Sequence, residues 1–264
     1  MIDSHCHLNL TQFDEDREAV IERAITSGIT TIVVPGVDLT TSQKAIELAE
    51  QYSGVFAAVG IHPNEAAHWQ PNQFPLLREL ALHPKVVAIG EIGLDYYRDY
   101  AAPEEQLAIL NSQLSLAHEI SKPVIIHNRD AIHDLWPIMK AWQTLLSAEH
   151  HPLANRPGVF HSYDGDLKLA DELRSFHFYL GISGPVTFKN AQDRQELVKA
   201  LGTRQILLET DSPYLSPNPF RGRRNEPAHI RLIAEKIASL QEKTVEDIGL
   251  STEENTKSLF MEIV

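Results

Sequence analysis

Residues 86–127 read VVAIGEIGLDYYRDYAAPEEQLAILNSQLSLAHEISKPVIIH, and this stretch decides the fold. It begins with an apolar run at 86–91 and ends with a second apolar run at 124–127, both typical of buried strands. Between them, 103–120 carries leucines at helical spacing, and its proline and two glutamates at 103–105 suit a helix N-terminus. The stretch therefore predicts a strand, a helix and a second, parallel strand.

The same alternation continues in both directions along the chain. Helical patterns also occupy 16–27 and 41–52. Eight candidate strands fall at 2–7, 30–35, 55–62, 86–91, 124–127, 158–161, 178–182 and 206–211. Eight strand–helix units in 264 residues predict an α/β protein, a (β/α)8 TIM barrel formed as a single domain over 1–264, with a doubly wound open sheet as the alternative. Residues 141–157 are the loosest segment, and we expect a surface loop there before the sixth strand.

Composition limits the classes of protein. The net charge of −13 excludes a chain that is basic overall, so any contact with nucleic acid must be local. The sequence contains no apolar run of about 18 residues, so we expect no membrane helix, and the N-terminus lacks the pattern of a signal peptide. The single cysteine, Cys6, rules out an intramolecular disulfide and is expected to be buried. We therefore expect a cytoplasmic protein, and nothing in the sequence implies an obligate protein partner.

Metal-ligand residue types occupy the ends of five predicted strands. The active site of such a barrel lies at the carboxyl ends of its strands. His5 and His7 share one face of the first strand because side chains alternate along a strand. The full set of predicted metal ligands is His5, His7, Glu91, His127, His161 and Asp211.

Four histidines and two carboxylates suffice for two divalent ions if one carboxylate bridges them. We assign Glu91 as the bridge, His5, His7 and Asp211 to one ion, and the two remaining histidines to the other. Glu91 and Asp211 are the predicted catalytic residues, with Asp211 placed to accept the proton of the attacking water. Histidine ligands favour Zn²⁺ or Mn²⁺, whereas Mg²⁺ prefers oxygen.

Other residues are candidates for substrate contact. His62 ends the third strand, so we expect it to touch substrate or a further metal. Glu209 shares the face of Asp211 and is predicted to orient a ligand or to hold a third metal. Asp95 is expected to have a structural or ligand-orienting role, and histidines away from strand ends are expected to be uninvolved.

Three arginines are predicted to contact phosphate. Arg221 and Arg223 lie in a proline-rich loop after the eighth strand, and Arg129 closely follows the fifth strand. Guanidinium groups bind phosphate oxygens in pairs.

Several stretches resemble the TatD-type metal-dependent deoxyribonuclease family of the amidohydrolase superfamily. They are 3–8 (DSHCHL), 60–63 (GIHP), 90–96 (GEIGLDY), 122–131 (KPVIIHNRDA), 208–215 (LETDSPYL), 221–227 (RGRRNEP) and 255–260 (NTKSLF). The resemblance implies a metal-dependent barrel hydrolase that acts on nucleic acid, often as a 3′ to 5′ exonuclease and usually with Mg²⁺. It places the metal ligands on the same six residues.

The chain departs from the family at two places. The family commonly has His-Cys-Phe-Ser-Gly at the sixth strand, whereas residues 161–165 read HSYDG. Asp164 thus adds an acid beside the expected site, and the segment 143–157 is longer than usual.

Three hypotheses follow. The first is a hydrolase that cleaves phosphodiester bonds of DNA by a metal-activated hydroxide, as a 3′–5′ exonuclease on single-stranded ends. The second keeps two metals but acts on an amide, a carboxyl ester or a small phosphate ester, for which the arginine loop would be unnecessary. The third is a metal-dependent binding protein without catalysis, against which the intact Glu91 and Asp211 argue.

Overall fold

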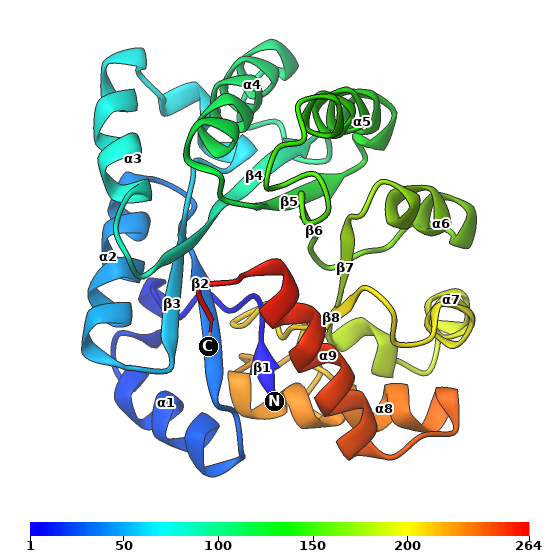
Figure 1. The fold of residues 1–264 in the computed structure, drawn as a ribbon. Helices are drawn as coiled ribbons and strands as arrows, with labels where there is room; N and C mark the ends of the chain where they lie inside the picture. Colours follow the sequence, from blue (N-terminus) through cyan, green and yellow to red (C-terminus); the bar gives the residue numbers. More distant parts are fainter. Residues whose placement is uncertain (264) are drawn as a thin grey trace.

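Short parallel strands pair in sequence order around a ring in the computed structural model, which describes residues 1–263 (Figure 1). Every neighbouring pair from β1 to β8 is parallel, as strand–helix–strand units require. The strands are β1 (Ile2–Asp3), β2 (Thr31–Pro35), β3 (Val55–Val59), β4 (Val86–Asp95), β5 (Val124–Arg129), β6 (Gly158–Phe160), β7 (Tyr179–Ile182) and β8 (Ile206–Leu208). The predicted (β/α)8 barrel is confirmed.

Helices form a layer outside the ring. They are α1 (Arg17–Thr26), α2 (Leu39–Gln51), α3 (Phe74–Ala81), α4 (Pro103–Ile120), α5 (Ile132–Ala148), α6 (Leu167–Ser175), α7 (Gln192–Leu201), α8 (Ile230–Gln241) and α9 (Val245–Leu259). Short 3₁₀ turns are η1 (Thr11–Phe13), η2 (Pro63–His68), η3 (Pro71–Gln73), η4 (Gly184–Thr187) and η5 (Pro227–His229). The larger apolar core lies between the strands and these helices.

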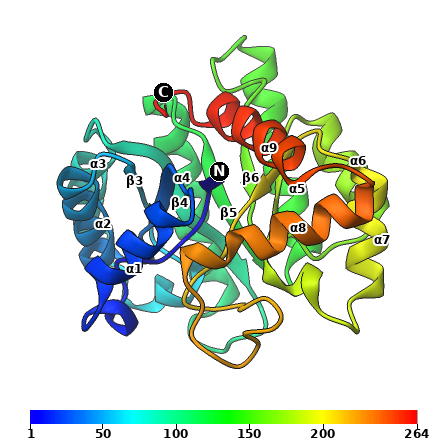
Figure 2. The same cartoon turned by 90° about the horizontal axis from the view of Figure 1, so that it is seen from below.

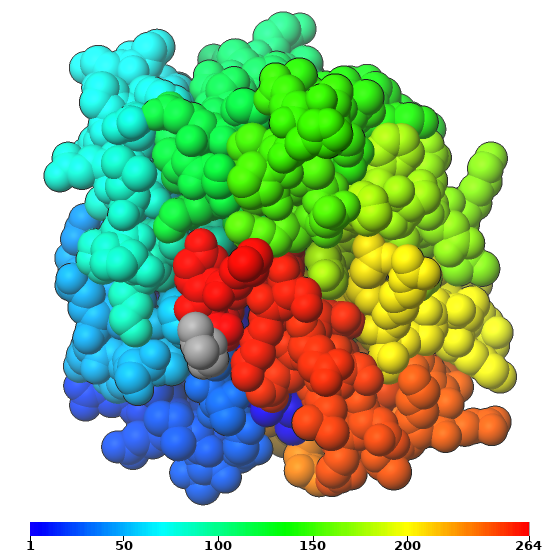
Figure 3. Space-filling model, in the orientation of Figure 1, coloured from blue at the N-terminus to red at the C-terminus, as the bar shows by residue number. Residues whose placement is uncertain are grey.

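A second apolar cluster fills the ring itself. It takes one face of each strand, for example Val33 from β2, Ile125 from β5 and Leu207 from β8. Leu259 and Phe260 join this cluster, so α9 and the residues after it cover one end of the barrel (Figures 1 and 3). The long loop after β8 lies on the opposite side of the molecule from α9 (Figure 2). One end of the barrel is thus closed by side chains, and the other carries the loops.

Hydrogen bonds between the first and last strands close the ring. The Ser4 N–H donates to Leu208 O at 3.0 Å, and the Asp211 N–H donates to His5 O at 2.9 Å. Cys6 forms an isolated parallel bridge with Ser212 and is fully buried, as predicted. Pairing therefore continues beyond the bounds of β1 and β8, and this holds the segments that carry His5 and Asp211 side by side.

β4 runs four residues past its predicted end because Gly93 permits close approach to β5. Gly93 has a φ of +146°, and a Cβ at this position would lie 1.9 Å from His127 O. Only glycine combines this backbone conformation with that spacing. The strand can thus pass the metal-ligand positions and reach Asp95.

The prediction of a loop over 141–157 is wrong in its first half. α5 extends to Ala148, because Trp142 and Leu146 are buried against the core and extend the apolar face of the helix.

Within residues 1–263, no helix has both the length and the hydropathy needed to cross a membrane.

Replacing Gly93 by alanine should destabilise the protein by about 3 kcal/mol or more, because the new Cβ meets a backbone carbonyl and the φ is unfavourable. Urea unfolding measures the change. The matched control is Gly249→Ala in α9, where the new Cβ would meet only the flexible Met1 side chain. Equal stability of the Gly93→Ala protein and the wild type would contradict this account of β4.

Candidate active site

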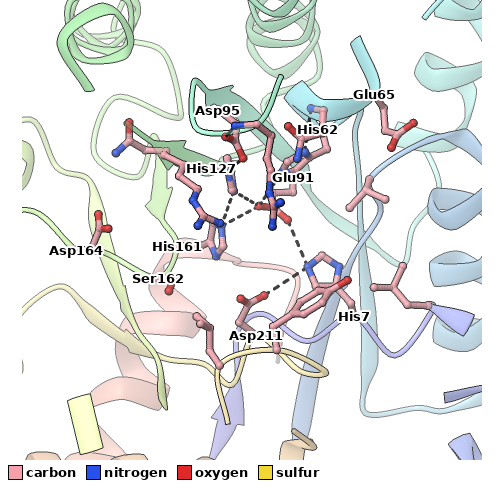
Figure 4. A pocket seen from close by; sticks show the side chains of 18 of the residues that line it. His7, His62, Glu65, Glu91, Asp95, His127, His161, Ser162, Asp164 and Asp211 are labelled. Carbon is pink, nitrogen blue, oxygen red and sulfur yellow. Dashed lines mark hydrogen bonds and ion pairs between the residues drawn. The ribbon is translucent and has the colours of Figure 1, made fainter. Parts of the chain in front are cut away.

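The barrel brings all six sequence-predicted ligand residues to its open end. Two follow β1, one lies in β4, one lies in β5, one directly follows β6 and one follows β8. All except the fully buried His5 line one cavity of about 670 Å³. Figure 4 shows Glu91 between His127 and His161 on one side and His7 on the other.

One group of ligand atoms surrounds Glu91 Oε2. His5 Nε2 and His7 Nε2 lie 3.1 Å apart, and each lies 3.4 Å from Glu91 Oε2. Asp211 Oδ1 lies 3.7 Å from His5 Nε2 and 3.6 Å from His7 Nε2. Ligand atoms that share a tetrahedral ion at about 2.0–2.1 Å are about 3.3 Å apart. The spacing of these four donors therefore fits one divalent ion.

A second group surrounds the other oxygen of the same carboxylate. Glu91 Oε1 lies 2.8 Å from His127 Nδ1 and 2.8 Å from His161 Nε2. The two ring nitrogens lie 3.2 Å apart. Three donors at this spacing fit a second ion with further positions open. Glu91 thus presents one oxygen to each group, as a bridging carboxylate would.

Contacts behind the ligands orient the imidazole rings. His7 Nδ1 lies 3.3 Å from Pro35 O and His127 Nε2 lies 3.1 Å from Asp95 Oδ2. A proton on each of these nitrogens leaves the opposite ring nitrogen with a free lone pair toward the site. Asp95 therefore has the ligand-orienting geometry that was expected for it.

The charges of the groups around Glu91 show that the site favours a cation. Burial opposes the charge on Glu91, but His161 and two further histidines outweigh it and hold the pKa of this carboxyl well below its usual range. Burial likewise opposes protonation of His161, yet Glu91 and neighbouring carboxylates raise the pKa of His161 to about 10. Burial lowers the pKa of His5 to about 3, which keeps the imidazole in its neutral, ligating form. A divalent ion would take the place of the proton on His161.

His62 faces the same cavity in a different hydrogen-bonding state. Its Nδ1 accepts the Asn64 N–H at 3.1 Å, so Nε2 carries the proton of the neutral ring. Nε2 lies 3.5 Å from Glu91 Oε1. This arrangement suits a hydrogen-bond donor toward the cavity, yet His62, Glu91 and His127 also form a group whose ligand atoms lie within 4.8 Å of one another. Both sequence-based roles for His62, substrate contact and a further metal, therefore remain predictions.

Glu209 lies fully buried behind His161. Its Oε1 accepts the Ser162 N–H and lies 3.8 Å from His161 Nδ1, while Oε2 has no hydrogen-bond partner among the described residues. Gly181 makes room for it, since a Cβ there would lie 2.1 Å from Glu209 Oε2. His5, His161 and Glu209 also form a group whose ligand atoms lie within 4.8 Å of one another. Both sequence-based roles for Glu209, the orienting role and a third metal, therefore remain predictions.

The three arginines that were predicted to bind phosphate lie at different places in the structure. Arg129 lines the cavity, whereas Arg221 and Arg223 are not among its lining residues. Arg221 Cζ lies 4.4 Å from the centre of the Phe188 ring. Their contact with substrate stays a prediction.

Two cavity arginines were missed by sequence reasoning. Arg98 follows β4 in the DYYRD run, where proximity to a ligand strand was an available signal. Arg194 comes from α7 and lies 3.7 Å from Asp164, so it offsets the extra acid noted at 161–165. No local pattern marks a helical residue such as Arg194 as part of the site.

A buried carboxylate that was also missed ties β1 to the end of β8. Asp3 accepts hydrogen bonds from Thr210 N at 2.9 Å and Thr210 Oγ1 at 2.6 Å. Burial raises the pKa of Asp3 to about 7. This contact sets the separation of His5 and Asp211, each of which lies within two residues of it.

The barrel and its histidine–carboxylate centre define a hydrolase, and comparison with known proteins gives the family. The family model described as "TatD related DNase" matches residues 2–261. The chain belongs to this TatD family. The resemblance noted in the sequence is therefore confirmed.

Relatives cover nearly the whole chain. An "Uncharacterized metal-dependent hydrolase YabD" of Bacillus subtilis (strain 168) is 43% identical over 260 residues, covering 98% of each chain. The "3'-5' ssDNA/RNA exonuclease TatD" of Escherichia coli (strain K12) is 34% identical over 266 residues, again covering 98% of each. The solved structure of YJJV, a TatD homologue from Escherichia coli K12, superposes with a TM-score of 0.89 at 30% identity and covers 99% of this chain and 98% of its own.

The metal-free protein should lose stability as pH rises. Burial raises the pKa of Glu209 to about 8 from an ordinary value of 4.5, so the folded state holds more protons than the unfolded state between these values. Stability falls with pH where the folded state holds more protons, and Glu209 should account for about 1 kcal/mol between pH 7 and 8.5. Urea unfolding in a chelator at several pH values measures this loss.

Glu209→Gln should reduce that loss by about 1 kcal/mol between pH 7 and 8.5, because the amide mimics the protonated acid, while the raised pKa of His161 leaves a remaining slope. Glu22→Gln on the exposed surface of α1 serves as the matched control and should leave the slope unchanged. An equally steep loss of stability in the Glu209→Gln protein would contradict the assignment.

Proposed function

We propose that this protein is a metal-dependent phosphodiesterase that removes nucleotides from the 3′ ends of single-stranded DNA. The observation that carries the proposal is Glu91, whose two oxygens face two separate groups of ligand atoms. The similarity to the Escherichia coli protein named a 3′–5′ exonuclease on single-stranded DNA and RNA supports the choice of bond and strand.

The proposal includes two divalent ions. His5, His7 and Asp211 would hold one, and the two histidines from β5 and β6 would hold the other. When bound, such ions neutralise phosphoryl oxygens and increase the acidity of water. Four imidazole nitrogens support Zn²⁺ or Mn²⁺ as the tightest ions, and Mg²⁺ stays compatible with the two carboxylates.

The residues of the chain supply the remaining chemistry. Burial raises the pKa of Asp211, which favours it as the acceptor of the proton that the attacking water loses. His62 Nε2–H, which lies 3.5 Å from Glu91 Oε1, would donate to an oxygen of the scissile phosphate. Burial of the ligand side chains beneath the cavity limits the entry of bulk water and strengthens these interactions.

Local positive charge allows an acidic protein to bind a polyanion. The net charge is −13, yet Arg98, Arg129 and Arg194 line the cavity above the ligands. The guanidinium groups of Arg98 and Arg129 would contact backbone phosphates near the scissile bond, while Arg194 neutralises Asp164. A cytoplasmic location is part of the proposal and is supported by the free, buried thiol of Cys6.

Asp211→Asn should lower kcat on a single-stranded oligonucleotide by about 10²- to 10⁴-fold, as expected for loss of a general base. Shortening of a 5′-labelled oligonucleotide by metal-loaded protein measures it, and a ladder of shorter labelled products shows removal from the 3′ end. The matched control is His68→Asn in η2, whose side chain is 80% exposed and should be dispensable.

Full activity of the Asp211→Asn protein would contradict the proposed role of this carboxylate. Failure of the wild type to shorten any DNA or RNA strand, together with hydrolysis of an amide, a carboxyl ester or a small phosphate ester, would favour the second hypothesis instead.

A further inference from the structure

We propose that a set of exposed aromatic and guanidinium faces at the cavity mouth binds an unpaired nucleobase of the substrate. We call this set, made of Tyr97, Arg98, Tyr100 and Arg129, the aromatic rim. The inference rests on the proposed function and specifies its substrate class, a single strand that carries bases. It accounts for selection of single-stranded ends by contacts away from the scissile phosphate.

In the rim, guanidinium carbons lie close to the centres of tyrosine rings. Arg129 Cζ lies 3.9 Å from the centre of the Tyr97 ring. Arg98 Cζ lies 5.4 Å from the Tyr97 ring and 6.0 Å from the Tyr100 ring. Such spacing orders the planes of the tyrosines and arginines before any ligand arrives.

Both tyrosine rings remain open to solvent. Tyr97 is 57% exposed and Tyr100 is 60% exposed, although each side chain is large and mostly apolar. Tyrosines of the core, such as Tyr163 and Tyr179, are 7% and 8% exposed. Exposed aromatic surface beside a catalytic cavity is typical of a binding site.

Hydrogen bonds connect the rim to the residues that surround Glu91. The backbone N–H groups of Tyr97 and Arg98 donate to Asp95 Oδ1 at 3.0 and 2.9 Å. The other oxygen of Asp95 lies 3.1 Å from His127 Nε2. Arg129 lies two residues after His127 on β5, and its carbonyl accepts the Tyr96 N–H at 2.9 Å. The rim therefore lies at a fixed position relative to the two groups of ligand atoms.

The charges of the rim are available to substrate. Neither Arg98 nor Arg129 forms an ion pair with a carboxylate within residues 1–263, in contrast to Arg194 and Arg224. Arg98, Tyr100 and Arg129 line the same cavity as Glu91 and Asp211. One nucleotide could thus place its phosphate near the guanidinium groups while its base stacks on a ring.

Stacking also separates single strands from duplexes. A base in a duplex interior has both faces covered by its neighbours, whereas an unpaired base offers a free face to an aromatic ring or a guanidinium plane. Stacking tolerates all base types, so the rim selects for unpaired bases without selecting a sequence. A nucleotide matches both features of the rim, because its base can stack on the flat rings and its phosphate can pair with the free positive charges.

The test measures binding by metal-loaded protein, with cleavage excluded. Fluorescence anisotropy compares a labelled ten-residue thymidine oligomer having phosphorothioate linkages with an oligomer of equal length and linkage that has no bases. The wild type should bind the base-bearing oligomer at least about tenfold more tightly. Tyr97→Ala and Tyr100→Ala should each weaken binding of the base-bearing oligomer about tenfold, equivalent to about 1.4 kcal/mol.

Matched variants separate stacking from a structural role. Tyr97→Phe and Tyr100→Phe keep the rings and should bind both oligomers as the wild type does. Leu250→Ala, at a 64% exposed site on α9, controls for surface truncation. Weaker binding of both oligomers by the alanine variants, unchanged binding of both, or a wild type indifferent to bases would each overturn the proposal.

Cleavage of ordinary oligonucleotides, measured separately, distinguishes this proposal from the proposed function. If the strand is shortened but binding shows no dependence on bases, only the rim proposal fails. If binding depends on bases and on the tyrosine rings but no strand is shortened, only the proposed phosphodiesterase activity fails.

Discussion

The carboxylate of Glu91 is the group around which this site is organised. It is buried, and its two oxygens face different sets of imidazoles, with His5 and His7 on one side and His127 and His161 on the other. A buried charge persists only when it is paired. In the metal-free protein the proton on His161 provides the pairing charge, and divalent ions would provide a stronger one. The low pKa of Glu91 and the high pKa of His161 both follow from this arrangement.

The closed parallel barrel is what allows one carboxylate to meet four imidazoles from distant parts of the chain. Parallel strands have their carboxyl ends at the same end of the barrel, so a ligand residue at the end of one strand lies near the ligand residues of the others. Closure of the ring between β1 and β8 brings Asp211 to the ligands that follow β1. Thr210 donates two hydrogen bonds to Asp3, and the Asp211 N–H donates to His5 O. The α9 end of the barrel is filled with apolar side chains and stabilises the ring. Stability and chemistry are thus placed at opposite ends of the same strands.

Periodicity explains why much of the site was predictable from sequence. His5 and His7 share a strand face, His127 and His161 each follow an apolar run, and Asp211 comes three residues after one, so the strand pattern places them at one end of a barrel. The assignment of Glu91 as the bridge was also made from sequence: the number of ligands required one bridging carboxylate, and Glu91 is central in the order of the strands.

What could not be predicted depends on packing between elements distant in sequence. The Asp3–Thr210 contact joins residues 207 positions apart, and Arg194 reaches the cavity from a helix with no local signal. Sequence reasoning placed Arg221 and Arg223 at the cavity because their loop follows β8, but the loop path decides which side chains line it. The loop over 141–157 was predicted from His150, His151, Pro152 and Asn155, all in its second half, and the first half is helical because Trp142 and Leu146 are buried against the core.

The central claim is that Glu91 lies between two bound ions, and anomalous diffraction from crystals of metal-loaded protein tests it most directly. Data collected at the absorption edge of Zn²⁺ or Mn²⁺ should show two peaks per chain. One is expected beside His5, His7 and Asp211, and the other beside His127 and His161, with one Glu91 oxygen directed at each. A single peak, or two peaks that Glu91 does not separate, would contradict the account.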